Sequence, residues 1–397
     1  MSVVPSERGI QAWLDAAPNS ERTGDYRAIR PERMRAFLAH LPAPPAPCTV
    51  AGTKGKGSTV RLIEAALGAN GLATVAFTSP HVVSVLERWR IDGRNADPAV
   101  LAPLCERVEE LEEASGLRLS WFERSFAVAC LLAHLRQGAF LCEVGLGGRL
   151  DATNALDAAV AVLTHVSHDH REVLGATTWH IAREKLAISR AGRPLVIAPQ
   201  DDATTLAIWH RLPPGREMRW AQRPAQAFAL ALAGAHQQDN AATALLAARL
   251  YRPGLDLDLA RAGMAKATLV ARCQLVGRVL VDGAHNGPSL AATLAVAQAR
   301  FGRDWTLVLG TAQDKEIEAM LAEVPAEVAV VRCGYANARA RGEQQWPAAA
   351  RRLPWFAEVQ HALAAIPGNA VVSGSLYLAG EALAALDGGL QPTDRAG

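Results

Sequence analysis

The chain has 397 residues, of which 50% are hydrophobic and 20% charged, and its formal net charge is +2 at pH 7. The basic residues are dispersed, which argues against a nucleic-acid partner. No apolar run comes near the ~18 residues of a membrane span, and no signal-peptide regions are found, which argues against a membrane partner. The six cysteines have no metal-like spacing, so we expect a cytoplasmic enzyme of roughly two or three domains with reduced thiols.

Short apolar runs alternate with amphipathic stretches along the first part of the chain. The runs predict strands at 48–51, 73–78, 139–144, 158–166 and 195–199, with helices at 58–70, 99–114, 123–136 and 178–190. Residues 200–235 are less regular, and a helix is predicted at 236–250. This alternation indicates a parallel sheet with helices on both faces.

The same pattern then restarts in the last third of the chain. The predicted strands there lie near 278–283, 305–310, 327–332 and 370–374, with helices between them. We therefore predict two α/β domains, one over residues 1–275 and a smaller one over residues 276–397.

The run Ala51-Gly-Thr-Lys-Gly-Lys-Gly-Ser-Thr59 lies between the first predicted strand and the first predicted helix. Its three glycines permit a tight turn that directs backbone N–H groups at an anion. Lys56 adds a positive charge, and Ser58 or Thr59 offers a hydroxyl for Mg²⁺. Gly57 separates Lys56 from Ser58, where the usual phosphate loop has Lys next to Ser or Thr. The strand–loop–helix context predicts phosphate binding rather than a simple glycine turn.

A second polar segment, Glu143-Val-Gly-Leu-Gly-Gly-Arg-Leu-Asp-Ala-Thr-Asn154, follows an apolar predicted strand. The strand delivers Glu143 to its C-terminal end, the edge of a doubly wound sheet where ligands gather. A carboxylate there suits Mg²⁺, which takes oxygen ligands. The alternative is a glycine-rich turn with an incidental Glu.

Three histidines and an aspartate crowd the segment Thr164-His-Val-Ser-His-Asp-His170. Such density is typical of metal sites and suggests the H-x-H-x-D-H signature of zinc hydrolases. The register fails, because Ser167 stands where that signature needs His. We favour His170 as a ligand of the same Mg²⁺ as Glu143, with His165 and His168 as hydrogen-bonded interior residues.

A third polar segment, Val279-Leu-Val-Asp-Gly-Ala-His-Asn286, is an apolar strand that ends in a polar turn. Asp282 and His285 lie just past the strand end, where they can face a cleft between domains. The alternative is a plain turn.

Motifs spread over nearly the whole chain, from about residue 10 to about residue 385, occur in the order that is found in one known protein family. They are Gly52-Thr-Lys-Gly-Lys-Gly-Ser58, Thr78-Ser-Pro-His81 with Glu87-Arg88, Phe122-Glu123, Glu143 to Asn154, Asp169-His170, Glu184-Lys185, His236-Gln237 with Asn240, Asp282 to Asn286, Asp314-Lys315 and Gly374-Ser-Leu-Tyr377. In this order the chain resembles the folylpolyglutamate synthase/dihydrofolate synthase family of the Mur ligase superfamily. The family's α/β fold has a P-loop-containing, Mur-ligase-like central domain with a parallel sheet and a smaller Rossmann-like C-terminal glutamate-ligase domain.

The resemblance implies an ATP-dependent amide ligase. The family phosphorylates a folate carboxylate to an acyl phosphate, which the amino group of L-glutamate then attacks as phosphate leaves. It implies ATP and Mg²⁺ as cofactors, dihydropteroate or a reduced folate together with L-glutamate as substrates, and a monomeric enzyme.

The resemblance also implies site residues. For the ATP site they are Gly52, Thr53, Lys54, Gly55, Lys56, Gly57, Ser58, Thr59, Gln237, Asn240, Arg272, Asp282 and His285. For the metal they are Ser79, Glu143, His170 and Lys185. Lys56, Lys185 and His285 are the implied catalytic residues. Lys185 matches a lysine that the family carbamylates with CO₂, although from the residues alone Arg183-Glu-Lys185 suggests a surface lysine. The site is expected to be complete only when the two domains close.

The chain departs from the family's motifs at several places. Lys185-Leu-Ala-Ile188 replaces Lys-Ala-Gly-Ile, Arg272-Cys-Gln274 replaces Arg-Leu-Glu, and Gly287 replaces the Pro after Asn286. Region 200–235 is also short for the family. These departures leave open a related ligase that acts on a different small carboxylic acid. A zinc hydrolase would leave the phosphate loop unused, and a non-catalytic nucleotide-binding regulator would not need the metal ligands.

Overall fold

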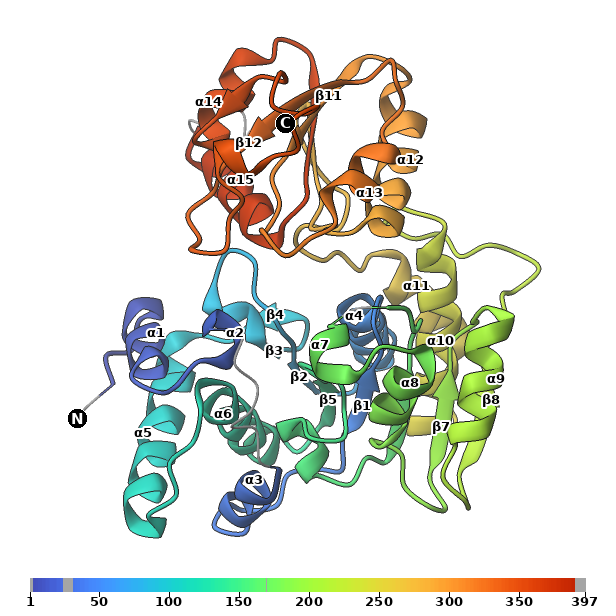
Figure 1. Ribbon diagram of the computed structural model, residues 1–397. Coiled ribbons are helices and arrows are strands. Elements are labelled where there is room, and N and C mark those ends of the chain that lie inside the picture. Colours follow the sequence, from blue (N-terminus) through green and yellow to red (C-terminus); the bar gives the residue numbers. More distant parts are fainter. Residues whose placement is uncertain (1–2, 24–30, 169, 390–397) are drawn as a thin grey trace. The chain divides into compact units, whose positions relative to one another are not determined.

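The computed structural model describes residues 3–23, 31–168 and 170–389. The chain forms two compact units, Met1–Leu230 with Gln237–Ala267 and Ala231–His236 with Thr268–Gly397 (Figure 1). The longer segment of the second unit starts at Thr268 and includes β9 (Gln274–Val276), which pairs antiparallel with β10 (Val279–Val281) in the second sheet. The predicted domain boundary, between residues 275 and 276, lies within β9.

Within its described residues, the first unit has an eight-stranded sheet of order β4-β3-β2-β5-β1-β6-β7-β8. Its parallel strands are β1 (Cys48–Ala51), β2 (Thr74–Phe77), β5 (Ala139–Glu143), β6 (Val160–Leu163), β7 (Pro194–Ile197) and β8 (Glu217–Trp220). The short strands β3 (Trp89–Ile91) and β4 (Arg94–Asn95) pair antiparallel at one edge. Every residue of β1 is buried, as expected for a central parallel strand.

Helices connect and cover these strands. They are α1 (Glu7–Asp15), α2 (Ser20–Thr23), α3 (Pro31–Leu38), α4 (Lys56–Ala69), α5 (Pro98–Ser115), α6 (Trp121–Arg136), α7 (Arg171–Leu174), α8 (Thr178–Leu186), α9 (Asp202–Arg211), α10 (His236–Tyr251) and α11 (Leu257–Ala265). Local chemistry fixes their ends: a capping box between Ser120 and Glu123 starts α6, and left-handed Gly116 ends α5.

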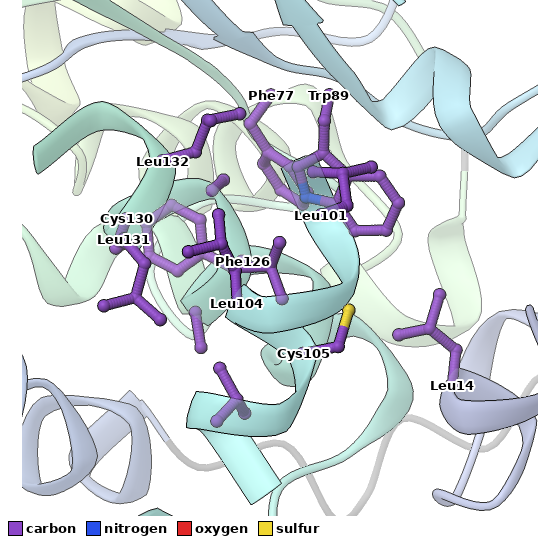
Figure 2. Close-up of a cluster of buried hydrophobic side chains, with 14 of the residues drawn as sticks. Leu14, Phe77, Trp89, Leu101, Leu104, Cys105, Phe126, Cys130, Leu131 and Leu132 are labelled. Atoms are coloured by element: carbon purple, nitrogen blue, oxygen red, sulfur yellow. The ribbon is translucent and has the colours of Figure 1, made fainter. Parts of the chain in front are cut away.

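The largest hydrophobic core of the first unit lies between the sheet and helices α5 and α6 (Figure 2). Phe126 on α6 packs against Phe77 of β2 and Phe140 of β5, with ring centroids 5.5 and 6.4 Å apart. Trp89 of β3 is fully buried, and its indole N–H donates to the Ser125 carbonyl. Burying each phenylalanine side chain of this kind contributes roughly 1.5–3 kcal/mol, which stabilises this part of the sheet.

The second unit has its own sheet and core. The six strands described there have the order β13-β12-β11-β14-β10-β9, and they include β11 (Trp305–Leu309), β12 (Ala329–Cys333), β13 (Trp355–Phe356) and β14 (Asn369–Ser373). Its helices are α12 (Gly287–Phe301), α13 (Ile317–Ala322), α14 (Val359–Ala365) and α15 (Leu376–Gly389). Buried side chains from β10, β11, α12 and α13 form one cluster.

The structure confirms the predicted α/β fold with mostly parallel sheets. It corrects the interpretation of region 200–235, which contains helix α9 and edge strand β8. The predicted strand 158–166 is too long, since β6 ends at Leu163 and a polar loop follows. Of the helices that the structure describes, none combines the length and apolar character needed to cross a membrane.

Candidate functional site

Residues 52–55, which we call the phosphate loop, join buried strand β1 to the first turn of α4. Gly52 has a positive φ of 155°, and a Cβ there would lie 1.8 Å from Oγ1 of Thr164. Gly55 has a φ of 86°, and a Cβ there would lie 2.3 Å from Oδ1 of Asn240. Gly55 is also the N-cap, and it gives the first turn no side-chain hydrogen bond. The amides of this turn are therefore oriented for an anion.

Two lysines converge on one carbonyl oxygen of this loop. Nζ of Lys56, the first residue of α4, lies 3.3 Å from the Gly52 oxygen, and Nζ of Lys185 lies 3.0 Å from it. Lys185 is only 4% exposed, so it is not the surface lysine that its local sequence suggests. Lys56 is half-buried. Helix α8, remote in sequence, thus supplies a second amino group to the loop.

The loop is tied to the segment that follows β6. The Thr53 and Lys54 amides donate to the His165 carbonyl at 2.9 and 3.2 Å. The Thr53 hydroxyl donates to the Ser167 carbonyl at 3.0 Å and accepts from the Ser167 amide at 3.1 Å. These bonds hold the loop in one conformation, which reduces the entropy that is lost when a ligand binds.

Helix α10 supports the other side of the loop. Asn240 donates to the side-chain oxygen of Gln237 at 2.9 Å, and Gln237 donates to the Ser58 hydroxyl at 3.4 Å. The structure therefore brings both residues to the phosphate loop. Two hydroxyls of this turn are candidates for a metal ion, those of Ser58 and Thr59. Thr59 is fully buried, so the Ser58 hydroxyl is the more accessible of the two.

Ser79 and Glu143 meet at the C-terminal ends of neighbouring strands β2 and β5. The Ser79 amide donates to Oε2 of Glu143 at 3.1 Å, and both side chains are buried. Glu87 accepts from the amides of residues 82, 83 and 84, which fixes the turn that follows Ser79. Ser79 and Glu143 therefore lie together, with a hydroxyl and a carboxylate at one sheet edge.

The histidine-rich segment is more dispersed than its sequence suggests. His170 has a left-handed φ of 48° and lies 3.7 Å from a carboxylate oxygen of Glu172, whereas His168 is exposed and contacts the Thr178 hydroxyl. His165 is half-buried, and burial lowers its pKa, with Lys54 lowering it further. Asp169 lies outside the described residues. Among those described, no three His, Cys, Asp or Glu side chains gather as metal ligands.

The glycine-rich loop after Glu143 is organised by one buried carboxylate. Oδ2 of Asp151 accepts from the Gly145 and Leu146 amides, each at 3.0 Å, and Oδ1 accepts from the amide and hydroxyl of Thr153 at 3.0 and 2.6 Å. Burial raises the pKa of Asp151, while these hydrogen bonds lower it part of the way back. Asp151 was not among the residues singled out from the sequence, although it ends the run Gly-Gly-Arg-Leu-Asp.

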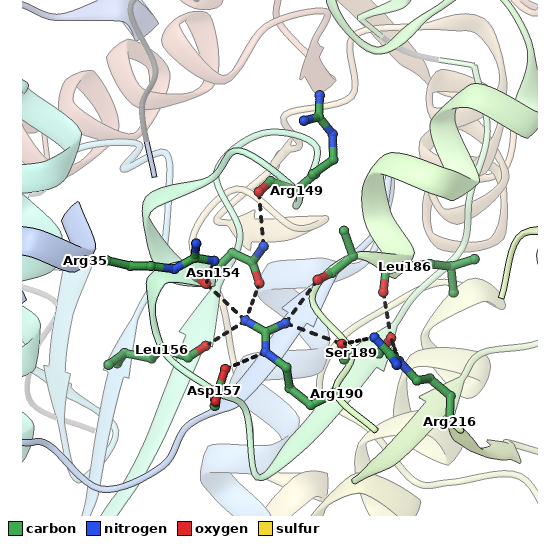
Figure 3. A network of polar contacts seen from close by, with 10 residues as sticks. Arg35, Arg149, Asn154, Leu156, Asp157, Leu186, Ser189, Arg190 and Arg216 are labelled. Carbon is green, nitrogen blue, oxygen red and sulfur yellow. Dashed lines mark hydrogen bonds and ion pairs between the residues drawn. The ribbon is translucent and has the colours of Figure 1, made fainter. Parts of the chain in front are cut away.

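The same loop is anchored to helix α8. The Arg149 amide donates to the Glu184 carbonyl at 2.9 Å, and its guanidinium pairs with the Glu184 carboxylate at 2.8 Å. Beyond α8, Arg190 donates to both the backbone and side-chain oxygens of Asn154 (Figure 3). The loop that follows Glu143 and the helix that carries Lys185 are therefore one connected assembly.

In the second unit, Asp282 organises the segment around Arg272. Its carboxylate accepts from the Ala284 amide, the Thr293 hydroxyl and the Cys273 amide, each at 2.8 Å. Cys273 has a left-handed φ of 46°, a conformation that costs free energy in residues other than Gly and Asn. Asp282 thus holds a strained turn, and its exposure is only 8%.

The departure from the Arg-Leu-Glu motif has a local explanation. Oε1 of Gln274 accepts from the Ala271 amide at 3.1 Å, so an amide side chain supplies the acceptor that the turn requires. Arg272 donates to the Ala271 carbonyl at 3.0 Å. His285 follows the same strand end as Asp282, with Nδ1 3.0 Å from the Gly283 carbonyl. Arg272, Asp282 and His285 therefore lie in one region of the second unit.

Comparisons of sequence agree on one family. Residues 271–380 match the Mur ligase, glutamate ligase domain family. The chain is 33% identical over 336 residues to dihydrofolate synthase/folylpolyglutamate synthase of Escherichia coli, covering 79% of this chain and 78% of that protein. It is 32% identical over 342 residues to a probable bifunctional folylpolyglutamate synthase/dihydropteroate synthase of Haloferax volcanii, covering 76% of this chain but 40% of that longer protein.

Comparisons of structure extend over nearly the whole chain. Folylpolyglutamate synthase of Mycobacterium tuberculosis, complexed with ADP, matches with a TM-score of 0.84 at 26% identity, covering 97% of this chain and 99% of that one. Bifunctional folylpolyglutamate synthase/dihydrofolate synthase of Yersinia pestis, complexed with AMPPNP and a Mn ion, matches with a TM-score of 0.79 at 26% identity, covering 95% and 98%.

Proposed function

Because the chain belongs to the dihydrofolate synthase/folylpolyglutamate synthase family of ATP-dependent Mur-type ligases, we propose that it joins L-glutamate to a pteroate or folate carboxylate. The observation that carries the proposal is the phosphate loop, on which Lys56 and Lys185 both donate to Gly52 beside the paired Ser79 and Glu143. Dihydropteroate or a reduced folate is the proposed acceptor, and L-glutamate is the proposed amine.

The first half of the reaction transfers the γ-phosphoryl group of ATP. A carboxylate oxygen of the acceptor attacks phosphorus, the bond to the bridging oxygen of ADP breaks, and an acyl phosphate forms. Charge on the transferring group must be balanced, and we assign this role to Lys56 and to the amides of the first turn of α4. Gln237 and Asn240 brace this loop and are proposed to lie toward the adenine side.

A divalent cation fits the donors at the strand ends. The Ser79 hydroxyl and the Glu143 carboxylate are hard oxygen ligands, and Mg²⁺ is usually held by one or two protein oxygens together with phosphates and water. We assign Ser79, Glu143 and His170 to this cation, and a carbamylated Lys185 to a second one. The cation supplies charge neutralisation at the phosphates, and the protein supplies its position.

The second half of the reaction forms the amide. The amino nitrogen of L-glutamate, in its neutral form, attacks the acyl carbon, the bond from that carbon to the phosphate oxygen breaks, and the nitrogen loses a proton. We assign Arg272, Asp282 and His285 of the second unit to the nucleotide's phosphates and ribose.

Assembly and location complete the proposal. The chain works as a monomer in the cytoplasm, without nucleic acid or membrane. All six cysteines are buried thiols with no disulfide, which suits a reducing compartment.

A reconstituted reaction tests the function. Purified protein receives ATP, Mg²⁺ and L-glutamate with either dihydropteroate or tetrahydrofolate, and phosphate release and product mass are recorded. Product heavier than the acceptor by one glutamyl residue, with one phosphate released per bond, is the expected result. Reactions without acceptor measure uncoupled hydrolysis of ATP.

The same assay distinguishes the proposed function from the alternative of a related ligase that acts on another small carboxylic acid. If neither pterin acceptor yields product while a simple aromatic acid releases phosphate in a glutamate-dependent manner, the acceptor assignment is wrong and the ligase assignment stands. If no acid stimulates phosphate release, the ligase assignment also fails.

A further inference from the structure

A cavity of about 790 Å³ opens on the first unit away from the phosphate loop. It is lined by α4 beyond its first turn, by α11 and by the β3–β4 turn. It also reaches Thr74, the first residue of β2, whereas Ser79 follows the other end of that strand. The cavity volume is within the ~300–1,000 Å³ typical of small-molecule sites.

Positive charge dominates the polar part of the lining. The Glu64 carboxylate in the cavity wall is neutralised, because it accepts from Arg61 at 3.3 Å and from Arg90 at 2.9 Å. Asp92 is likewise paired with Arg136 at 2.6 Å. The remaining two cations of the lining are Arg94 and Lys266.

Arg94 and Lys266 are both exposed. Among the residues that the structure describes, neither has a carboxylate within ion-pair distance, in contrast to Arg61. Two cations thus face a cavity whose acids are already paired, and this excess of positive charge favours an anion.

The other part of the lining is apolar, and it includes two glycines of the helices α4 and α11. Gly263 of α11 packs tightly on α4, since a Cβ there would lie 2.4 Å from the Ala65 carbonyl oxygen. Gly68, in the last turn of α4, is different: a Cβ there meets no atom within 4 Å. Glycine in a helix costs up to roughly 1 kcal/mol relative to alanine, and no packing contact in the described structure requires it at this position.

We propose that this cavity is a binding site for a small organic anion, with carboxylate or phosphate groups on Arg94 and Lys266 and an apolar body over Gly68. The site is distinct from the phosphate loop and does not depend on the proposed ligase function. An aromatic ring fits the apolar wall of Ala65, Leu72 and Leu259. Aromatic acids and aromatic phosphates share this chemistry.

Calorimetric titration of the full chain tests the site with two probes, phthalate and phenyl phosphate. The double variant Arg94→Ser/Lys266→Ser should weaken binding by about 10- to 100-fold, because two charged donors are lost. Gly68→Leu should abolish binding by filling the cavity while leaving its charges unchanged. The probe with the lower dissociation constant identifies which anionic group the site prefers.

Matched controls locate the site. Arg249→Ser/Arg252→Ser removes the same charge from exposed positions on and just after α10 and should leave binding unchanged. Lys56→Ala should also leave it unchanged. The proposal is overturned by no binding of either probe to the wild-type chain, by equal weakening in both double variants, or by binding that disappears in Lys56→Ala but survives in Arg94→Ser/Lys266→Ser. Circular dichroism of Gly68→Leu establishes that its helix is intact, and a folded Gly68→Leu variant that still binds would also contradict the cavity.

Discussion

The side-chain nitrogen of Lys185 lies 3.0 Å from the carbonyl oxygen of Gly52, across 133 positions of sequence. Lys185 is near the C-terminal end of α8, and Gly52 is the first residue after β1. The contact brings a buried nitrogen to the loop that we assign to the ATP phosphates. Carbamylation would leave one N–H on this nitrogen. The hydrogen bond to the Gly52 carbonyl oxygen can therefore persist while two carboxylate oxygens are added.

The role of Lys185 can be tested by substitution. We expect Lys185→Ala to lose most activity and acetate to restore part of it, since a small carboxylate can occupy the vacated metal position. Lys185→Arg should stay inactive, because guanidinium cannot form the carbamate. Steady-state phosphate release with and without added bicarbonate measures these effects. A fully active Lys185→Arg would show that the residue acts as a cation or has no catalytic role.

Lys56→Ala should abolish turnover and leave the fold intact. The half-buried side chain makes one long hydrogen bond, of 3.3 Å, to Gly52, so its removal should change the free energy of unfolding by about 1 kcal/mol or less. Phosphate release and thermal melting are the measurements. Arg252→Ala, which removes an exposed cation just after α10, serves as the control. Near-normal turnover in Lys56→Ala would contradict the phosphate-loop assignment.

Glu143→Gln and Ser79→Ala should each raise the Mg²⁺ concentration that half-saturates activity. Gln keeps an oxygen that can accept from the Ser79 amide, so the substitution removes charge while preserving the 3.1 Å hydrogen bond. His170→Ala should depress activity in the same manner. Activity is measured against Mg²⁺ concentration, with a zinc-selective chelator as the control. One tightly bound zinc per chain and activity without Mg²⁺ would refute the assignment of these ligands.

Asp151→Asn should lower activity about 10- to 100-fold by displacing the glycine-rich loop. An amide group cannot accept at both oxygen positions, so two of the four donors lose their partner. Asp157→Asn, an exposed change nearby, is the matched control. Unchanged kinetics in Asp151→Asn would show that the loop does not need this carboxylate.

The pH dependence of stability should also change in Asp151→Asn. Burial raises the pKa of Asp151, so the folded chain holds this proton more tightly than the unfolded chain does. Its stabilising contribution is therefore complete below the unfolded pKa of about 3.9 and declines as pH rises through the folded pKa. Urea unfolding from acid to neutral pH should show that the stability of the wild-type chain relative to Asp151→Asn declines as pH rises, because other carboxylates such as Asp201 and Asp314 titrate in both proteins. Parallel curves for the two proteins would contradict the direction of the shift.

Much of the fold could be predicted from the sequence, because buried parallel strands are continuous apolar runs. Strand β1 is such a run, and a glycine loop and an amphipathic helix follow it directly. Strand β8 (Glu217–Trp220) was missed because it is an edge strand in which charged and half-buried residues alternate. Its pattern has no continuous apolar signal, and its place beside β7 depends on the sheet.

Part of the candidate site could likewise be predicted from the sequence, and part of it could not. The glycines at 52 and 55 could be predicted, since their conformations are needed locally by a strand-to-helix turn. The burial of Lys185 could not be read from its neighbours, because it depends on how α8 packs against the loop. The bracing role of Asp151 was missed for a related reason: an aspartate in a glycine-rich turn has the same local signal whether or not its carboxylate is buried.

The first unit is not continuous along the chain. It resumes at Gln237, after the short segment Ala231–His236 that belongs to the second unit, and ends at Ala267. During synthesis the N-terminal segments leave the ribosome first, so α4 emerges well before α10, which braces the phosphate loop, and α11, which packs on α4 at Gly263. A ribosome that pauses before residue 267 therefore presents an unfinished nucleotide-binding unit with apolar surface open to chaperones. A pause beyond that residue leaves a unit whose chain is complete.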